Sequence, residues 1–119
     1  MAQFYTKFMQ NKTIEEFYLT CLDDKFKILN HKKIAQGELT SINLNPKDLA
    51  SVIVNTKNTT KIIISHCHPD GFCSPSNTDM ISTAKIIDIT KLLGVKFIDH
   101  IIVGKDGCYS YSQLKKIAN

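Results

Sequence analysis

The stretch from Lys61 to Asp79, KIIISHCHPDGFCSPSNTD, decides both the fold and the chemistry of this chain. It opens with residues 61–65 (KIIIS), an apolar β-branched run between polar residues, which is typical of a buried strand. Residues two apart on a strand point to the same side, so His66 and His68 leave one face together, roughly 7 Å apart along the chain. Cys67 is expected to face the other way. The two histidines can therefore converge on one cation.

Asp79 follows these histidines in the first turn of a predicted helix, where its carboxylate can supply a third ligand. Three protein ligands leave one position of a tetrahedral zinc ion open for water, which is typical of a catalytic site and not of a structural one. Water at such a position is acidified to a pKa near ~7 and becomes a nucleophile at neutral pH. The sequence therefore predicts a Zn²⁺ site formed by His66, His68 and Asp79.

Asp79 also fits a purely structural role. Residues 76–79 (SNTD) match a capping box, in which Ser76 caps the helix and the third residue after it returns a carboxylate. Residues 45–48 (NPKD) form a similar helix start with no histidine near them. We expect the two roles to exclude each other, because an aspartate that binds metal is not free to cap. The spacing alone leaves both interpretations open.

The same stretch resembles the RadC family of bacterial JAB/MPN (JAMM-type) metalloprotease domains. The family pattern H-N-H-P-S-G-x-x-x-P-S-x-x-D is matched without a gap at His66, His68, Pro69, Gly71, Pro75, Ser76 and Asp79. Similar blocks occur in the same order at residues 37–39 (GEL), 45–49 (NPKDL), 92–95 (LLGV) and 99–104 (DHIIVG). The resemblance covers nearly the whole chain. It implies an α/β fold in which a mixed β-sheet is flanked by helices, with the JAB/MPN, cytidine-deaminase-like architecture.

The chain departs from the family pattern at positions that are not predicted ligands. Cys67 stands where the family usually has asparagine, and Asp70, Phe72 and Glu38 also differ. These changes concern how the loop after the histidines recognises a substrate. RadC proteins carry an N-terminal helix-hairpin-helix region, for which these 119 residues leave no room. We therefore expect residues 1–119 to form one RadC-like domain, either a shorter family member or an excised catalytic domain.

Amide hydrolysis also needs a carboxylate that takes a proton from water and delivers it to the leaving amine. Glu15 and Glu16 lie at the entrance to a predicted strand, where neighbours point to opposite faces, so only one of them can face the site. The resemblance selects Glu15 through its E-x-F element, with Glu38 and Glu16 as alternatives. It also implies that the Ser76 hydroxyl helps to hold the oxyanion of the tetrahedral intermediate, a role that can coexist with capping.

Two further histidines require an interpretation. Asp99 and His100 lie on a predicted strand and face opposite sides, so either can hydrogen-bond a metal-bound histidine. We nevertheless expect His100 to be a satisfied core histidine. His31 lies among lysines in a predicted hairpin and gives no indication of function.

Hydrophobic periodicity and turn residues predict the other elements. Helices are expected at residues 2–10, 46–55 and 77–93, with Asn45 and Gly94 as caps, and a short terminal helix after Ser112. Strands are expected at residues 17–22, 26–35, 61–65, 97–103 and 108–111. On the long helix, the apolar residues at helical spacing are expected to pack into the core: Met80, Ile81, Ala84, Ile87 and Leu92.

Composition is consistent with one globular domain, because 119 residues with 43% hydrophobic content can bury a core. No apolar run is long enough to span a bilayer and no signal peptide is recognisable, so we expect a cytoplasmic protein without a membrane partner. The four cysteines are expected to be reduced thiols, with Cys73 the most exposed. The net charge of +4 comes with lysines spread along the chain, which predicts no nucleic-acid stripe.

The sequence thus predicts a zinc-dependent JAMM-type hydrolase that cleaves a peptide or isopeptide bond in a peptide or protein substrate. One alternative is a DNA-repair-associated, RadC-like accessory or nucleic-acid-processing domain, and others are a metal-dependent phosphodiesterase and an inactive interaction scaffold. A nuclease would favour carboxylate-rich Mg²⁺ or Mn²⁺ sites over two histidines. Zinc deamination is excluded, because no glutamate stands at the required place after His68. The oligomeric state is left open.

Overall fold

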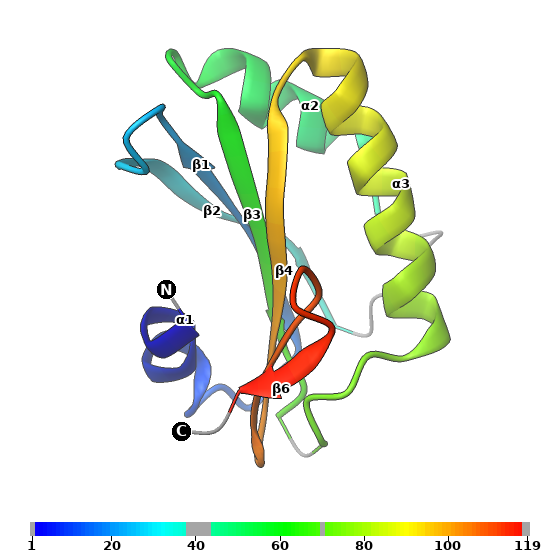
Figure 1. Cartoon of the computed structure of the whole chain (residues 1–119). Coiled ribbons are helices and arrows are strands. Elements are labelled where there is room, and N and C mark those ends of the chain that lie inside the picture. Colours follow the sequence, from blue (N-terminus) through cyan, green and yellow to red (C-terminus); the bar gives the residue numbers. More distant parts are fainter. Residues whose placement is uncertain (1, 38–43, 70, 118–119) are drawn as a thin grey trace.

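The computed structural model describes residues 2–37, 44–69 and 71–117, which form a twisted sheet between helices (Figure 1). Six strands pair in the order β2-β1-β3-β4-β5-β6. Their bounds are β1 (Glu16–Leu22), β2 (Ile28–Gln36), β3 (Lys61–Cys67), β4 (Lys96–Gly104), β5 (Gly107–Ser110) and β6 (Lys115–Ile117). Strands β3 and β4 are parallel and the other neighbouring pairs are antiparallel. The predicted α/β class with a mixed sheet flanked by helices is confirmed.

Helices cover both faces of the sheet. Helix α1 (Ala2–Met9) lies against one face, and α2 (Pro46–Asn55) and α3 (Asn77–Leu93) lie against the other (Figure 1). The α1 face buries Tyr5 and Met9 against Cys67, while the opposite face buries Phe17 and Ile86. Cys67 therefore faces away from the α3 side, as predicted. None of the helices in the described part of the chain has the length and apolar character that membrane crossing demands.

The connection from β3 to β4 positions the site. Parallel neighbours cannot be joined by a tight turn, and α3 supplies the crossover between them. Ser76 caps its first turn, and Gly94 ends it with a left-handed φ of 73° that glycine adopts without strain. As a result, the first turn of α3 begins beside the carboxyl end of β3, where the histidines lie.

The surface of α3 contradicts the predicted core stripe. Met80, Ile81 and Leu92 are 38%, 51% and 88% exposed. The residues that α3 buries are mostly small and polar: Asp79, Ser82, Thr83, Ile86 and Thr90. The prediction was wrong because the inward stripe of the helix runs instead through Asp79, Thr83 and Ile86, and Ile89 and Leu93 pack against the core beside it.

The chain after β5 also differs from the prediction. A strand, β6, replaces the short helix expected after Ser112, and it pairs antiparallel with β5 from Ser110 opposite Lys115. The reversal occurs in a turn that includes Leu114 at φ 52°, a left-handed conformation that a continuing helix does not allow. Cys73 is buried and not exposed, because its backbone N–H donates to Asp106 and fixes the loop against the end of β4.

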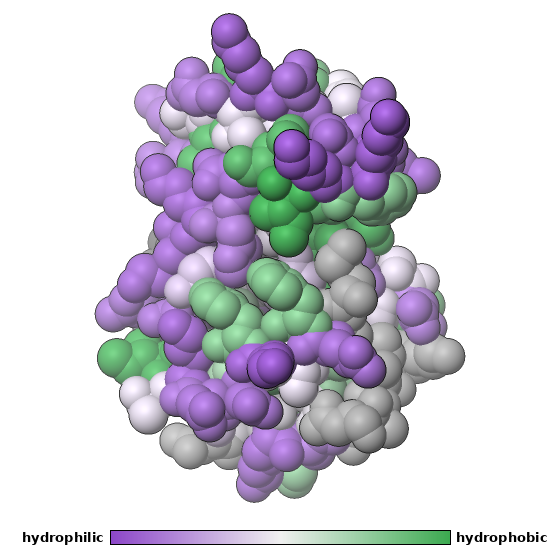
Figure 2. Space-filling view, turned by 90° about the vertical axis from the view of Figure 1, so that its left-hand side faces the viewer, coloured by the Kyte–Doolittle hydropathy of each residue, from purple (hydrophilic) through white to green (hydrophobic). Residues whose placement is uncertain are grey.

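The α1 side of the molecule has an aromatic layer. Phe4 and Phe8 of α1 are 42% and 38% exposed, and the Phe8 ring lies 4.9 Å from His31 and 5.0 Å from Tyr18, centroid to centroid. Figure 2 shows that the hydrophobic side chains on this side gather centrally, with hydrophilic ones around them. His31 thus belongs to a packing cluster under α1.

Candidate metal centre

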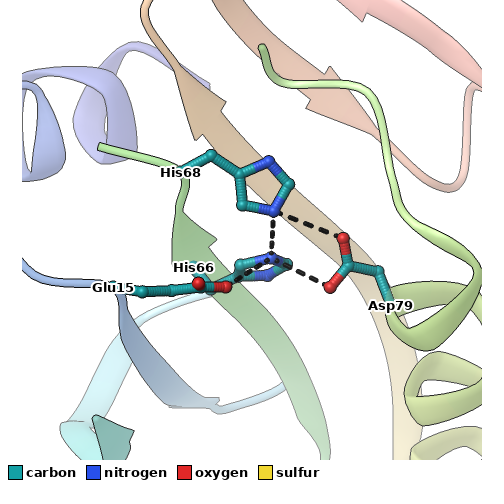
Figure 3. A group of neighbouring side chains, drawn as sticks. All are labelled: Glu15, His66, His68 and Asp79. Atoms are coloured by element: carbon teal, nitrogen blue, oxygen red, sulfur yellow. Dashed lines mark hydrogen bonds and ion pairs between the residues drawn. The ribbon is translucent and has the colours of Figure 1, made fainter. Parts of the chain in front are cut away.

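The structure brings together Glu15, His66, His68 and Asp79 from three separate parts of the chain (Figure 3). His66 lies near the end of β3, His68 directly follows β3, and Asp79 lies in the first turn of α3. Glu15 immediately precedes β1, which pairs antiparallel with β3 and so begins where β3 ends. One ligand atom from each residue lies within 4.8 Å of the others. The sequence predicted two catalytic residues, Glu15 and Ser76. Glu15 belongs to this group, and Ser76 caps the adjoining helix.

The distances suit a zinc ion. The Nε2 atoms of His66 and His68 are 2.9 Å apart, and they lie 3.2 and 3.3 Å from the two carboxylate oxygens of Asp79. Two ligand atoms at ~2.0–2.1 Å from one tetrahedral zinc lie roughly 3.3 Å apart, close to these values. Two imidazoles and a carboxylate are also a donor set that zinc accepts readily. The residues present therefore fit the metal that the sequence predicts.

A backbone carbonyl sets the orientation of His68. Its Nδ1 lies 2.7 Å from the carbonyl oxygen of Phe72, which can only accept, so Nδ1 donates and Nε2 faces the other site residues. The loop that carries this carbonyl packs directly on β4. A Cβ atom at Gly104 would clash with the backbone nitrogen of Cys73 and lie 2.7 Å from the carbonyl carbon of Phe72, so only glycine fits there. The loop thereby holds the His68 ring in place.

Asp79 both caps α3 and faces the histidines, so the expected conflict between these roles is wrong. Its Oδ2 accepts the Ser76 backbone N–H at 2.9 Å, and the Asp79 N–H donates to the Ser76 hydroxyl at 3.0 Å. A carboxylate has two oxygens and about four lone-pair sites, so capping leaves acceptor capacity for the site. Burial by itself raises the pKa of Asp79, but the hydrogen bonds with His66 and His68 outweigh burial and hold the pKa well below its usual range.

Glu15 and Glu16 point to opposite sides, as predicted. The Oε1 atom of Glu15 lies 3.8 Å from His66 Nε2. The Glu16 carboxylate instead lies 3.1 Å from the Lys12 Nζ atom and accepts a hydrogen bond from the Tyr18 hydroxyl at 2.8 Å. Of the two, Glu15 alone is placed to exchange protons within the site. The remaining alternative, Glu38, lies outside the described residues.

His100 is more than the satisfied core histidine expected from sequence, because it contacts a predicted ligand. Its Nε2 lies 2.7 Å from His66 Nδ1, and its Nδ1 lies 2.6 Å from the Thr83 hydroxyl. Burial lowers the pKa of both His66 and His100, although the Asp79 carboxylate partly opposes this effect at His66. Asp99 faces the other side and accepts from the Ser110 hydroxyl.

Thr83 was missed from sequence, although a signal for it exists. It lies four residues after Asp79, which places the two side chains on one face of the helix. A helix whose first turn supplies a ligand to a site directs its next turn toward the same region. A threonine at that position is therefore a candidate partner for a ligand.

A mixed sheet that carries two histidines at the end of a central strand, with carboxylates from a neighbouring strand and helix, defines an α/β domain with a group able to hold a metal ion. The model of the family described as "RadC-like JAB domain" matches residues 1–116, and the chain belongs to this family. The predicted family is confirmed by this match.

Two relatives of this chain carry a family-level name. A UPF0758 protein of Photorhabdus laumondii subsp. laumondii is 26% identical over 111 residues, which cover 93% of this chain and 48% of that protein. A UPF0758 protein of Actinobacillus pleuropneumoniae serotype 5b is 29% identical over 107 residues, covering 90% and 48%. The chain spans about half the length of these relatives.

Proposed function

We propose that this domain is a zinc-dependent hydrolase of the JAMM type, which cleaves a peptide or isopeptide bond in a peptide or protein substrate in the cytoplasm. The proposal rests on membership of the RadC-like JAB family. The observation that carries it is the position of the Glu15 carboxylate, 3.8 Å from His66 Nε2 and beside two further metal-ligand side chains. Because this distance exceeds the 3.2 and 3.3 Å that separate the histidine Nε2 atoms from the Asp79 carboxylate, we assign Glu15 to the base and the other three residues to the metal.

Different residues would bind the metal and transfer the proton during hydrolysis. His66 and His68 would hold the metal through Nε2, and Asp79 through its carboxylate. A bound zinc ion supplies Lewis acidity, which lowers the pKa of water to near ~7 and polarises a substrate carbonyl. Glu15, whose side chain is 25% exposed and so reachable by substrate, takes a proton on Oε1 and returns it to the leaving amine. Phe17 is stacked on the His66 ring, with centroids 5.1 Å apart, and both side chains are buried.

The proposal is tested by incubating the purified domain with a peptide library and with isopeptide-linked peptides, with and without chelator. We expect cleavage that disappears with chelator and returns when zinc is added. Zinc-loaded protein that leaves all these substrates intact would contradict the assignment.

Ser76 provides a test of the oxyanion role. Its oxygen accepts the Asp79 N–H, which leaves the hydroxyl proton to donate to a substrate oxyanion. Ser76→Ala should lower the free energy of unfolding by about 1 kcal/mol, the usual effect of losing a cap. If Ser76 also supports the oxyanion, kcat should fall by about 10²–10³-fold. Both quantities are measured on the same preparation, by denaturant titration and by peptide hydrolysis.

The matched control for this variant is Asn45→Ala. Asn45 caps α2 by accepting the N–H groups of Lys47 and Asp48. The Asn45→Ala variant should lose about as much stability as Ser76→Ala, and its kcat should be unchanged. If Ser76→Ala behaves in the same way, Ser76 is a helix cap and nothing more.

The nucleic-acid alternative makes a different prediction. A net charge of +4 with dispersed lysines allows few phosphates to be neutralised together, so DNA association should be micromolar or weaker near physiological salt. The measurement is a titration of labelled single- and double-stranded DNA at two salt concentrations, with His66→Ala as the control. Tight binding that persists at the higher salt, or DNA cleavage that the His66 variant loses, would favour the repair or nuclease function instead.

A further inference from the structure

We propose that His100 and Thr83 are positioning residues that fix the proton of His66 on Nδ1 and so keep its Nε2 free for the metal. This inference rests on the metal site of the proposed function. It adds that the site depends on a buried chain of hydrogen bonds, which runs from His66 through His100 and Thr83 to the backbone of Asp79.

The chain is continuous and closed to water. His66 Nδ1 and His100 Nε2 are 2.7 Å apart, and His100 Nδ1 lies 2.6 Å from Thr83 Oγ1. The Thr83 hydroxyl donates to the backbone carbonyl of Asp79 at 2.8 Å. His66, His100 and Thr83 are each at most 1% exposed. Phe17 packs against both imidazole rings, with ring centroids 5.1 Å from His66 and 5.5 Å from His100.

Each hydrogen bond between two of these side chains uses one proton, so donors and acceptors can be arranged along the chain in only two directions. In the first, Thr83 donates to the Asp79 carbonyl and accepts from His100 Nδ1–H, and His100 Nε2 accepts from His66 Nδ1–H. His66 Nε2 then presents its lone pair to the site. In the second, the Thr83 hydroxyl donates to His100 Nδ1 and gives up its hydrogen bond to the Asp79 carbonyl, and His100 Nε2–H donates to His66 Nδ1. His66 Nε2 then carries a proton that points at the Asp79 carboxylate. Only the first direction allows His66 to bind a metal.

The Asp79 carbonyl favours the first direction because it can accept a proton but never donate one. When the Thr83 hydroxyl binds this carbonyl, its lone pairs face His100, and His100 must donate to them from Nδ1. Asp79 therefore serves the site twice, as a ligand through its carboxylate and as the anchor of the chain through its backbone. Without the hydroxyl, a proton on His100 Nδ1 would be buried with no acceptor. The first direction would then cost more free energy, and the reversed direction would become more populated.

The first test reads the protons directly. Long-range ¹H–¹⁵N NMR spectra of histidine-labelled, zinc-loaded protein distinguish the two nitrogens of each imidazole. We expect His100 to carry its proton on Nδ1 and to have an unprotonated Nε2. A proton on His100 Nε2 in zinc-loaded protein would overturn the inference, and this measurement needs no variant that must fold.

The second test removes the hydroxyl. Thr83→Val should weaken zinc binding by about 10–100-fold, the usual effect of losing a group that orients a ligand, as measured by competition with a chromophoric chelator. Thr83→Ser keeps the hydroxyl and should retain wild-type affinity. Thr90→Val is the matched control, because Thr90 is equally buried on α3 and donates to the carbonyl of Ile87, away from the site. It should bind zinc like the wild type.

These outcomes separate the inference from the proposed function. Wild-type zinc affinity in Thr83→Val would overturn the positioning role even if the enzyme is active. Zinc-loaded wild type that cleaves no peptide, while showing the expected His100 proton and the expected loss in Thr83→Val, would support the positioning role and count against hydrolysis.

Discussion

Replacing His68 with alanine should abolish stoichiometric zinc binding, whereas the wild-type domain should bind about one zinc ion per chain. The variant loses one of three ligands and retains only His66 and Asp79, too few to hold zinc tightly at an open site. The measurement is elemental analysis of protein purified without chelator. Because the His68 ring is held by a loop carbonyl and is partly exposed, its removal should leave the fold intact.

The control for this experiment is His31→Ala. His31 packs among the aromatic rings under α1 and supplies no ligand to the site. The His31→Ala variant should bind zinc like the wild type even if its stability falls. Full zinc occupancy in His68→Ala would show that the site has been assigned to the wrong residues.

Glu15→Gln should reduce the rate of hydrolysis by about 10²–10⁴-fold while zinc occupancy stays nearly intact. Glutamine keeps the size and hydrogen-bonding ability of the side chain but cannot take up a proton. The measurement combines kcat with elemental analysis of the same sample. Loss of metal together with activity would make Glu15 a ligand and not a base.

The neighbouring Glu16→Gln variant is a control at the same chain position with the opposite orientation. Glu16 pairs with Lys12 and Lys33, and ion pairs near the surface contribute at most about 1 kcal/mol. Its kcat should be unchanged. If Glu15→Gln keeps full activity, the base must be sought at Glu16 or Glu38.

Much of the site could be predicted because its residues obey simple periodicities. The alternation of a buried strand places His66 and His68 on one side and Cys67 on the other, and the structure agrees. Adjacent residues at a strand entrance separate Glu15 from Glu16 for the same reason. These arguments hold because they depend only on local backbone geometry.

The failures occurred where tertiary context overrides local pattern. Helical periodicity assigned Ile81 and Leu92 to the core, yet α3 turns Thr83 and Ile86 inward, where Thr83 contacts His100 and Ile86 joins the core. No single-sequence rule states what the facing surface is made of. The burial of Cys73 likewise depends on a contact with a strand that is distant in sequence.

The division of the site between two units of the fold has an evolutionary consequence. His66, His68 and Asp79, together with His100, all belong to the continuous segment from β3 through α3 to β4, whereas Glu15 immediately precedes the β1–β2 hairpin. The proposed metal ligands and the proposed base thus lie in separate parts of the fold. On the proposed function, a substitution of Glu15 in a descendant protein would abolish hydrolysis and leave the proposed metal-binding segment intact, free to acquire another role.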